Sequence, residues 1–198
     1  MKDMIKMVLV LTLLSCVSGG LLAFVRIGTK ERIEKQELEF VKGPAIRDIL
    51  TGASNNPLED RFKLMDGEVE RSFFVGVFEG KPNRIAFESA GKGGYGGDVG
   101  LMVGVDIEKS SLIGVGVTTH SETPGMGAKA QSDPSFVAQF KGLGVDKPVA
   151  VSKDGGSINA ISGATITSRA VCSGTSDALS IYTRLKPQLL EKSKAFEK

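Results

Sequence analysis

The chain has 198 residues, of which 41% are hydrophobic, enough for one domain with a core of its own and a membrane segment. Its 25 basic and 23 acidic residues are spread along the sequence and leave a formal net charge of only +2. No basic stripe is present that could follow a phosphate backbone, so the composition argues against nucleic acid as a partner.

The first predicted element is an apolar N-terminal helix, because residues 7–25 carry no charged side chain. A run of this length approaches the roughly 20 residues that a helix needs to cross a bilayer. It continues past the length of a cleaved signal peptide, so we expect residues 1–28 to form an uncleaved transmembrane anchor. The alternative is a lipoprotein signal that ends at Cys16. Because Cys16 lies in this run and Cys172 in a predicted helix near the other end, no disulfide is expected.

Residues 29–45 follow as a predicted stalk helix, charged and amphipathic, which leads to a soluble domain at residues 46–198. Basic residues flank the apolar run, with Lys2 and Lys6 before it and Arg26, Lys30, Arg32 and Lys35 after it. This distribution favours a cytoplasmic domain by the positive-inside rule, but large domains cross membranes largely regardless of such charges. Charge alone therefore leaves the orientation open.

Four strands are predicted next, in an antiparallel meander. Residues rich in β-branched and aromatic side chains at 71–79 and 84–88 flank a Gly-Lys-Pro-Asn turn and so predict a hairpin. Residues 100–106 and 112–119 predict two further strands, joined by the polar turn at 108–111. Connections as short as these join neighbouring antiparallel strands.

A short helix is predicted at 132–140, and residues 149–153 predict a strand that ends at the glycine turn at 155–156. The C-terminal helix is long, and Gly174 should weaken it by about 1 kcal/mol relative to alanine, while Pro187 should kink or end it. Strands closed by a helix predict an α+β fold, with an antiparallel-rich sheet packed with helices. The apolar face of the last helix has spacings of three and four: Val171, Thr175, Ala178, Tyr182, Leu185 and Leu189.

The segment before this helix, residues 159–168, has the character of an anion site. The first N–H groups of a helix lack internal partners and lie at the positive end of its dipole, so a phosphate is favoured there. Gly163 and Ala164 let the backbone approach a phosphate, and Thr165, Thr167 and Ser168 offer hydroxyl groups. The alternative is that Thr165 or Thr167 simply caps the helix, as threonines commonly do.

Three segments carry a resemblance to a known family. They are Ser162-Gly163-Ala164-Thr165 with the hydroxyl residues that follow, the glycine loop Gly94-Tyr95-Gly96-Gly97 with the next strand, and the loop at 120–127, His-Ser-Glu-Thr-Pro-Gly-Met-Gly. Together with the N-terminal span, they make the chain similar to the FMN-binding domain family. That family includes the G subunit of the Rnf electron-transport complex and the C subunit of the sodium-translocating NADH:quinone oxidoreductase, and the pattern is closer to the Rnf protein.

The resemblance implies an electron carrier whose FMN is attached, through its phosphate, to the hydroxyl of Thr165. It implies a single-pass protein of a bacterial or archaeal inner membrane, with residues 46–198 as an extracytoplasmic FMN-binding domain and no turnover by this polypeptide alone. The implied partners are the other subunits of an Rnf-type, ion-translocating complex and a flavin transferase that uses FAD and magnesium. The residues expected to bind the cofactor are Ser162, Gly163, Ala164, Thr165, Thr167, Ser168, Glu122, Thr123, Tyr95 and Met126.

Two positions depart from the family's pattern. The attachment signal commonly has an aspartate six positions before the modified threonine, where this chain has Asn159. An amide lacks that charge, so attachment is expected to be slower or incomplete if the transferase recognises the carboxylate. Met126 replaces a leucine with a side chain of similar volume, a change that costs little.

The loop residues have structural as well as functional interpretations. His120 is the only histidine, so no histidine cluster can form a metal site, and a structural role is expected for it. Glu122 either bonds a flavin ring or braces a backbone N–H group, and Tyr95 either lies against the ring or covers the core. Thr123-Pro124-Gly125 predicts a turn that serves as a scaffold.

Two other functions are compatible with the sequence. The domain could bind FMN or another phosphate-bearing ligand reversibly, as a sensor or cofactor chaperone. It could also be a redox-silent anchor or assembly subunit. These two hypotheses and the covalent carrier differ in whether flavin is present and in whether it stays attached when the chain is denatured.

Overall fold

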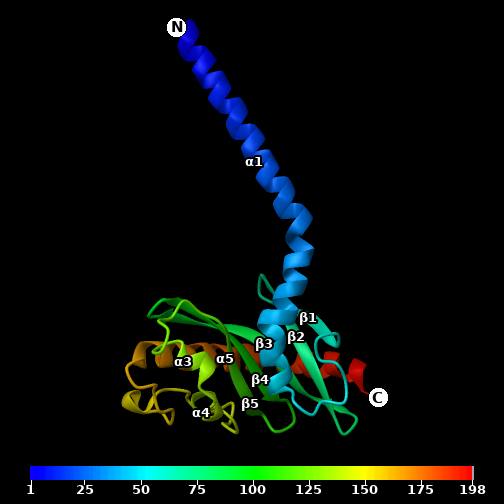
Figure 1. Cartoon of the computed structure of the whole chain (residues 1–198). Helices are drawn as coiled ribbons and strands as arrows, with labels where there is room; N and C mark the ends of the chain where they lie inside the picture. Colours follow the sequence, from blue (N-terminus) through cyan, green and yellow to red (C-terminus); the bar gives the residue numbers. More distant parts are fainter. Residues whose placement is uncertain (198) are drawn as a thin grey trace. The chain divides into compact units, whose positions relative to one another are not determined.

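The computed structural model describes residues 1–197 (Figure 1). The described residues divide into two compact units, one up to Glu39 and the other from Phe40 onward. The first unit holds helix α1 (Lys2–Gln36), in which no residue is buried. By length and composition, this helix is apolar enough to cross a membrane. The residues predicted as a stalk are helical throughout, and they include the π-helical segment η1 (Glu37–Lys42) and the start of α2 (Gly43–Ile49).

The second unit contains a five-stranded antiparallel sheet, with its strands in chain order. The predicted meander is confirmed by β2 (Val69–Phe78), β3 (Lys81–Gly94), β4 (Gly97–Asp106) and β5 (Ser111–Thr119). Strand β1 (Arg61–Asp66), which pairs with β2 at the edge of the sheet, was not predicted from the sequence. Only Leu64 of β1 is buried, so this strand lacks the apolar alternation that makes a strand recognisable.

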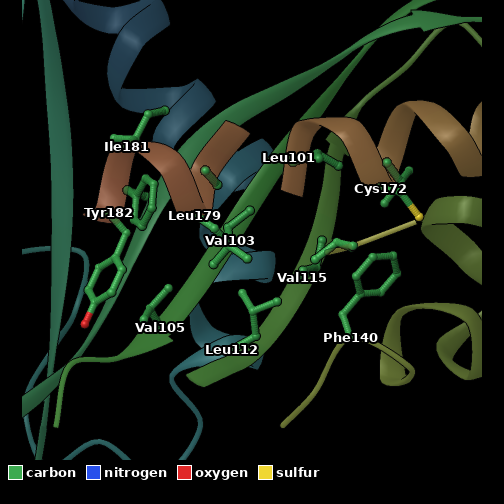
Figure 2. Packing of buried hydrophobic residues seen from close by; sticks show 14 of the residues in the cluster. Leu101, Val103, Val105, Leu112, Val115, Phe140, Cys172, Leu179, Ile181 and Tyr182 are labelled. Carbon is green, nitrogen blue, oxygen red and sulfur yellow. The ribbon is translucent and has the colours of Figure 1, made fainter. Parts of the chain in front are cut away.

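Helix α5 (Thr165–Ser193) packs against one face of the sheet and forms the main core with it (Figure 2). Every residue of the predicted apolar face is buried, so that prediction is confirmed. The largest of them, Tyr182, is 1% exposed, and its hydroxyl donates to the carbonyl of Ile107 at 3.4 Å. The buried phenol is therefore not left without a partner. The helix continues through Pro187 to Ser193, so the proline does not end it.

Two glycines let α5 and the sheet approach each other closely. A Cβ on Gly174 would lie 2.5 Å from the backbone nitrogen of Gly91 and 2.7 Å from Leu101 Cδ1. Ser89 of β3 completes this contact, because its hydroxyl donates to the carbonyl of Gly174 at 2.8 Å. Gly174 is thus a packing requirement, which outweighs the loss of helix propensity expected from its sequence position.

Helix α2 packs on the opposite face, because the sheet residues it contacts alternate with those that face α5. Ile46 of α2 and Leu50, the residue that caps its C-terminus, are buried. A Cβ added at Gly104 would collide with Ile49, and one at Gly116 would lie 3.1 Å from the Cβ of Ala45. Glycines on β4 and β5 therefore let α2 lie close to the sheet.

The segment after the sheet contains one wrong prediction. Residues 149–153 do not form a strand; Val151 makes a single parallel bridge to Ile158, and a 3-10 turn, η2 (Ser152–Asp154), follows. The reason is local, because Gly155 adopts a φ of +84° and turns the chain back, so that Ser152 N donates to the carbonyl of Ile158. The predicted short helix is present as α4 (Pro134–Ala138), capped by Asp133 and preceded by α3 (Lys129–Ser132).

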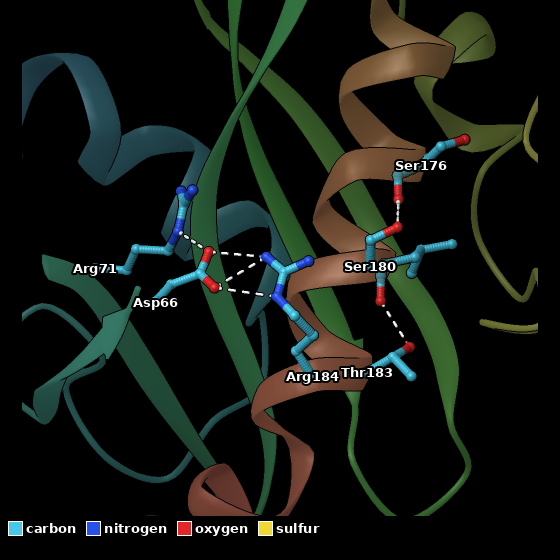
Figure 3. A network of polar contacts seen from close by, with 7 residues as sticks. Asp66, Arg71, Ser176, Ser180, Thr183 and Arg184 are labelled. Carbon is cyan, nitrogen blue, oxygen red and sulfur yellow. Dashed lines mark hydrogen bonds and ion pairs between the residues drawn. The ribbon is translucent and has the colours of Figure 1, made fainter. Parts of the chain in front are cut away.

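Asp66 fastens the edge strand β1 to α5 (Figure 3). Its carboxylate, 10% exposed, accepts a hydrogen bond from Arg71 Nε at 2.9 Å and two from Arg184 Nη2, at 2.9 and 3.0 Å. Burial alone would raise the pKa of Asp66, but the hydrogen bonds and charges of Arg184 and Arg71 outweigh it and hold the pKa below its ordinary value. The ionised carboxylate is therefore the form that the folded state prefers.

We expect Asp66→Asn to lower the free energy of unfolding by about 1 kcal/mol at pH 7. A lowered pKa stabilises the fold above the unfolded value of about 3.9, and this contribution is lost as pH falls through the folded value. The difference between variant and wild type should therefore shrink at acidic pH, which thermal melts of the detergent-solubilised chain would measure. Asp177→Asn is the control, an exposed carboxylate of α5 with no partner among the described residues. A difference that persists unchanged at pH 2 would contradict this assignment.

Candidate functional site

The candidate site is the start of α5, where the chain turns sharply into the helix. Gly163 adopts a φ of +77°, a value that residues with a Cβ rarely adopt. Ala164 follows at the N-cap, where its side chain makes no capping hydrogen bond. In residues 1–197 no acceptor pairs with the backbone N–H groups of Thr165, Ile166 and Thr167. Three unpaired N–H groups at the positive end of a 29-residue helix make a site for an anion.

The alternative that a threonine caps this helix is wrong. Thr167 Oγ1 instead donates to Glu122 Oε2 at 2.7 Å, and both side chains are buried. The hydroxyl of Ser168 donates to the carbonyl of Ala164 at 2.9 Å and accepts from the N–H of Ile161 at 3.0 Å. The hydroxyl protons of Thr167 and Ser168 are thus donated within the protein, where they hold the turn in place.

Glu122 joins the glycine loop to this turn. Besides the bond from Thr167, its Oε1 accepts the N–H of Gly96 at 3.0 Å. A Cβ on Gly96 would collide with the carbonyl of Ser121, so only glycine allows the loop to come so close. Three segments that are far apart in the sequence therefore meet at one carboxylate.

His120 has a structural position in the same loop. Its Nδ1 accepts the N–H of Glu122 at 3.2 Å, and its Nε2 lies 3.3 Å from Gln131 Oε1. Because Nδ1 accepts, a neutral ring carries its proton on Nε2 and donates it to Gln131. Gln131 in turn donates to the carbonyl of Val117, which ties the loop to the end of β5. The turn predicted after it is present, with Met126 N donating to Thr123 O at 3.2 Å.

Side chains around the turn differ in exposure. Thr165 is half-buried, and its hydroxyl makes no hydrogen bond to any described residue, while Ser162, Gly163 and Thr123 are exposed. Tyr95 is 74% exposed, Met126 48% and Ile166 47%. Ile166 was not among the site residues predicted from the sequence. Its place between two threonines in the first turn of the helix is the sequence feature that could have predicted an apolar side chain beside the site.

A second residue that the sequence analysis missed is Gln139. Its side-chain oxygen accepts the N–H of Asn159 at 2.7 Å, and its side-chain nitrogen donates to the carbonyl of Asn159 at 3.2 Å. This pair of bonds fixes the backbone at the start of the segment that leads to Thr165. The Asn159 side chain itself is exposed and has no partner in the described part of the chain.

Comparison with known proteins identifies the family. Residues 94–180 match the FMN-binding domain, a stretch that runs from the glycine loop into α5. Over 206 aligned positions the chain is 32% identical to the G subunit of the ion-translocating oxidoreductase complex of Pseudomonas aeruginosa, covering 98% of this chain and 95% of that protein. The chain belongs to this G-subunit family. The resemblance inferred from the motifs is thereby confirmed.

This chain shares its fold with two solved structures. The C subunit of the Na(+)-translocating NADH-quinone reductase from Parabacteroides distasonis superposes with a TM-score of 0.50 at 32% identity, over 59% of this chain and 63% of that one. NqrC of Shewanella oneidensis superposes with a TM-score of 0.52 at 24% identity, over 70% and 72%. The predicted α+β fold is confirmed.

The site in this member of the G-subunit family fits both parts of an FMN. The N–H groups that have no acceptor among residues 1–197 and the open backbone at Gly163 suit a phosphate, and the hydroxyl of Thr165, which has no described partner either, lies among them. The exposed apolar side chains of Tyr95, Met126 and Ile166 suit a flat ring. In residues 1–197 no group of three or more His, Cys, Asp or Glu side chains is arranged to hold a metal ion.

Cys172 lies further along α5, and both it and Cys16 are free thiols. Burial raises the pKa of Cys172 to about 12, and the charge of Asp154 adds to this shift. The thiol is therefore protonated at neutral pH and is a poor nucleophile.

Proposed function

We propose that this protein carries electrons through an FMN held by a phosphoester bond to Thr165, within an Rnf-type ion-translocating complex. The observation that carries the proposal is the position of Thr165, which is the first residue of α5, half-buried, with an unbonded hydroxyl beside three unpaired N–H groups. When bound, the flavin supplies the redox chemistry, and the protein supplies attachment, orientation and electrostatics.

The bond requires a second protein, a flavin transferase, as the family resemblance implies. Thr165 Oγ1 forms a bond to the phosphorus of the FMN half of FAD, the phosphoanhydride bond to AMP breaks, and AMP leaves. The hydroxyl proton of Thr165 is released to a base of the transferase. The half-buried Thr165 on an exposed turn is accessible to such an enzyme, whereas the buried Thr167 is not.

A covalent tether suits a carrier with a shallow site. Exposed side chains such as Tyr95 and Ile166 leave a ring open to electron exchange with neighbouring subunits. A phosphoester bond keeps the cofactor at a high effective concentration without tight enclosure. We place the domain on the extracytoplasmic side of the inner membrane, anchored by α1 and attached to the other subunits of the complex.

Intact-mass measurement of the protein from cells that carry its native operon tests the proposal. One FMN joined with loss of water adds about 438 Da to the chain. Denaturing gel electrophoresis under ultraviolet light then separates the alternatives. A fluorescent band at the chain's own position supports a covalent carrier, fluorescence at the dye front indicates reversible binding, and the absence of flavin in native membranes indicates a redox-silent subunit.

Asn159→Asp should increase the fraction of chains that carry flavin when the transferase is limiting. The Asn159 side chain is exposed, so the added charge has little effect on folding, and its backbone is fixed by Gln139. The mass spectrum of the intact chain gives the modified fraction at several times after induction. Equal time courses for both proteins would show that a carboxylate at this position is not recognised.

A further inference from the structure

Glu122 is a buried carboxylate that pairs with no cationic side chain in the described part of the protein. The residue is 6% exposed and forms no ion pair with any residue in the described range 1–197. Its two oxygens each accept one hydrogen bond, from Gly96 N at 3.0 Å and from Thr167 Oγ1 at 2.7 Å. Burying an ionised carboxylate without a counter-charge costs free energy, and its hydrogen bonds must compensate for that cost. Such hydrogen bonds make the segments that they join rigid.

The surrounding backbone is adapted to this carboxylate. A Cβ on Gly94 would lie 2.6 Å from Glu122 Oε1, and one on Gly127 would collide with Oε2. The same added atom on Gly127 would lie 2.8 Å from Thr167 Oγ1. Gly94 at the end of β3 and Gly127 in the loop after Glu122 thus leave the space that the carboxylate and its threonine partner occupy.

The two groups that Glu122 holds are each next to a candidate site residue. Gly96 follows Tyr95, whose side chain is 74% exposed, and Thr167 lies two positions after Thr165. The carboxylate itself is buried beneath them, so it does not line the exposed surface around Thr165. Any effect that it has on a group carried by Thr165 must therefore act through the two segments that it joins.

We propose that Glu122 is a positioning residue that holds the Tyr95 loop beside the turn carrying Thr165, so that Tyr95 contacts the flavin attached there. This inference rests on the proposed function of Thr165. Glu122 fixes the geometry of the loop, and Tyr95 makes the contact with the flavin. Glutamine at position 122 has the same shape, but its amide nitrogen can only donate, so it cannot accept both hydrogen bonds.

The test uses the flavinylated full-length protein, purified in detergent from its own host. A tyrosine in contact with a flavin quenches its fluorescence by electron transfer. Glu122→Gln should therefore keep the flavin mass, raise the flavin emission and lower its anisotropy, and Tyr95→Leu should raise the emission in the same way. Thr167→Val, which removes one of the two hydrogen bonds without changing the volume of the side chain, should give an intermediate increase.

Asp66→Asn is the matched control, since it breaks another carboxylate contact to α5 outside the site and should leave the emission unchanged. In the Tyr95→Leu background, Glu122→Gln should add no further emission, because both changes remove the same contact. Loss of the flavin mass in Glu122→Gln, at a melting temperature no lower than that of Asp66→Asn, would overturn the inference, because Glu122 would then act on attachment at Thr165 and not through the Tyr95 contact. Wild-type emission and anisotropy in flavinylated Glu122→Gln, or additive effects in the double variant, would overturn it. Wild-type chain that carries no covalent flavin would instead overturn the proposed function, and the inference with it.

Discussion

Thr165→Ala should give a folded chain with no covalent flavin. The hydroxyl of Thr165 is the acceptor of the proposed phosphoester, and alanine offers no oxygen for that bond. The fold should tolerate the change, because the side chain is half-buried, its hydroxyl has no described partner, and alanine favours a helix. The loss of flavin should be complete, measured as the absence of the added mass and of the fluorescent band.

Thr183→Ala is a matched control on the same helix. Its hydroxyl donates to the carbonyl of Leu179 at 2.8 Å, and the residue is exposed. Flavin attachment should be unchanged in this variant. Flavin still fixed to denatured Thr165→Ala would remove Thr165 from the assignment, and the neighbouring exposed Ser162 would then be the first residue to test.

Gly91→Ala should be among the most destabilising single-methyl additions in the domain. The new Cβ would collide with the backbone carbonyl of Ala170, and backbone on both sides cannot rotate away as a side chain would. We expect a loss of about 3 kcal/mol in the free energy of unfolding, at the upper end for overpacking. For a domain of this size, that corresponds to a fall of roughly 6–12 °C in Tm.

Gly93→Ala separates this collision from backbone strain. Gly93 lies in the same strand with a φ of +73°, and nothing is within 4 Å of an added Cβ. It should therefore lose only the roughly 1–2 kcal/mol that a left-handed conformation costs a residue with a side chain. Thermal melts that place the two variants in the opposite order would show that α5 can move away from β3.

Much of the fold could be predicted because its signals are local. The buried face of α5 follows the helical period from Val171 to Leu189, and the hairpin of β2 and β3 has a turn between two apolar runs. The failures have equally local causes. β1 has one buried residue, and residues 149–153 have the composition of a strand but are turned back by Gly155.

The site was only partly predictable. The motif ending at Thr165 coincides with the start of α5, as expected from small residues before an apolar period. The bond between Glu122 and Thr167 joins residues 45 positions apart, and no spacing rule predicts such a pair. The contact between Gly91 and Gly174 could not be predicted either, because each glycine is required by the position of the other, which is far away in the sequence.

Helix α5 begins at Thr165 and continues to Ser193, with one face packed against the sheet along the main core. A chromophore fixed to its first residue would thus be an intrinsic reporter of global unfolding, since the turn around it loses its shape when α5 leaves the sheet. Flavin emission and far-ultraviolet circular dichroism should then change at the same temperature in a single transition. Such a built-in reporter would allow the stability of this protein to be followed inside intact membranes, without purification or an added dye.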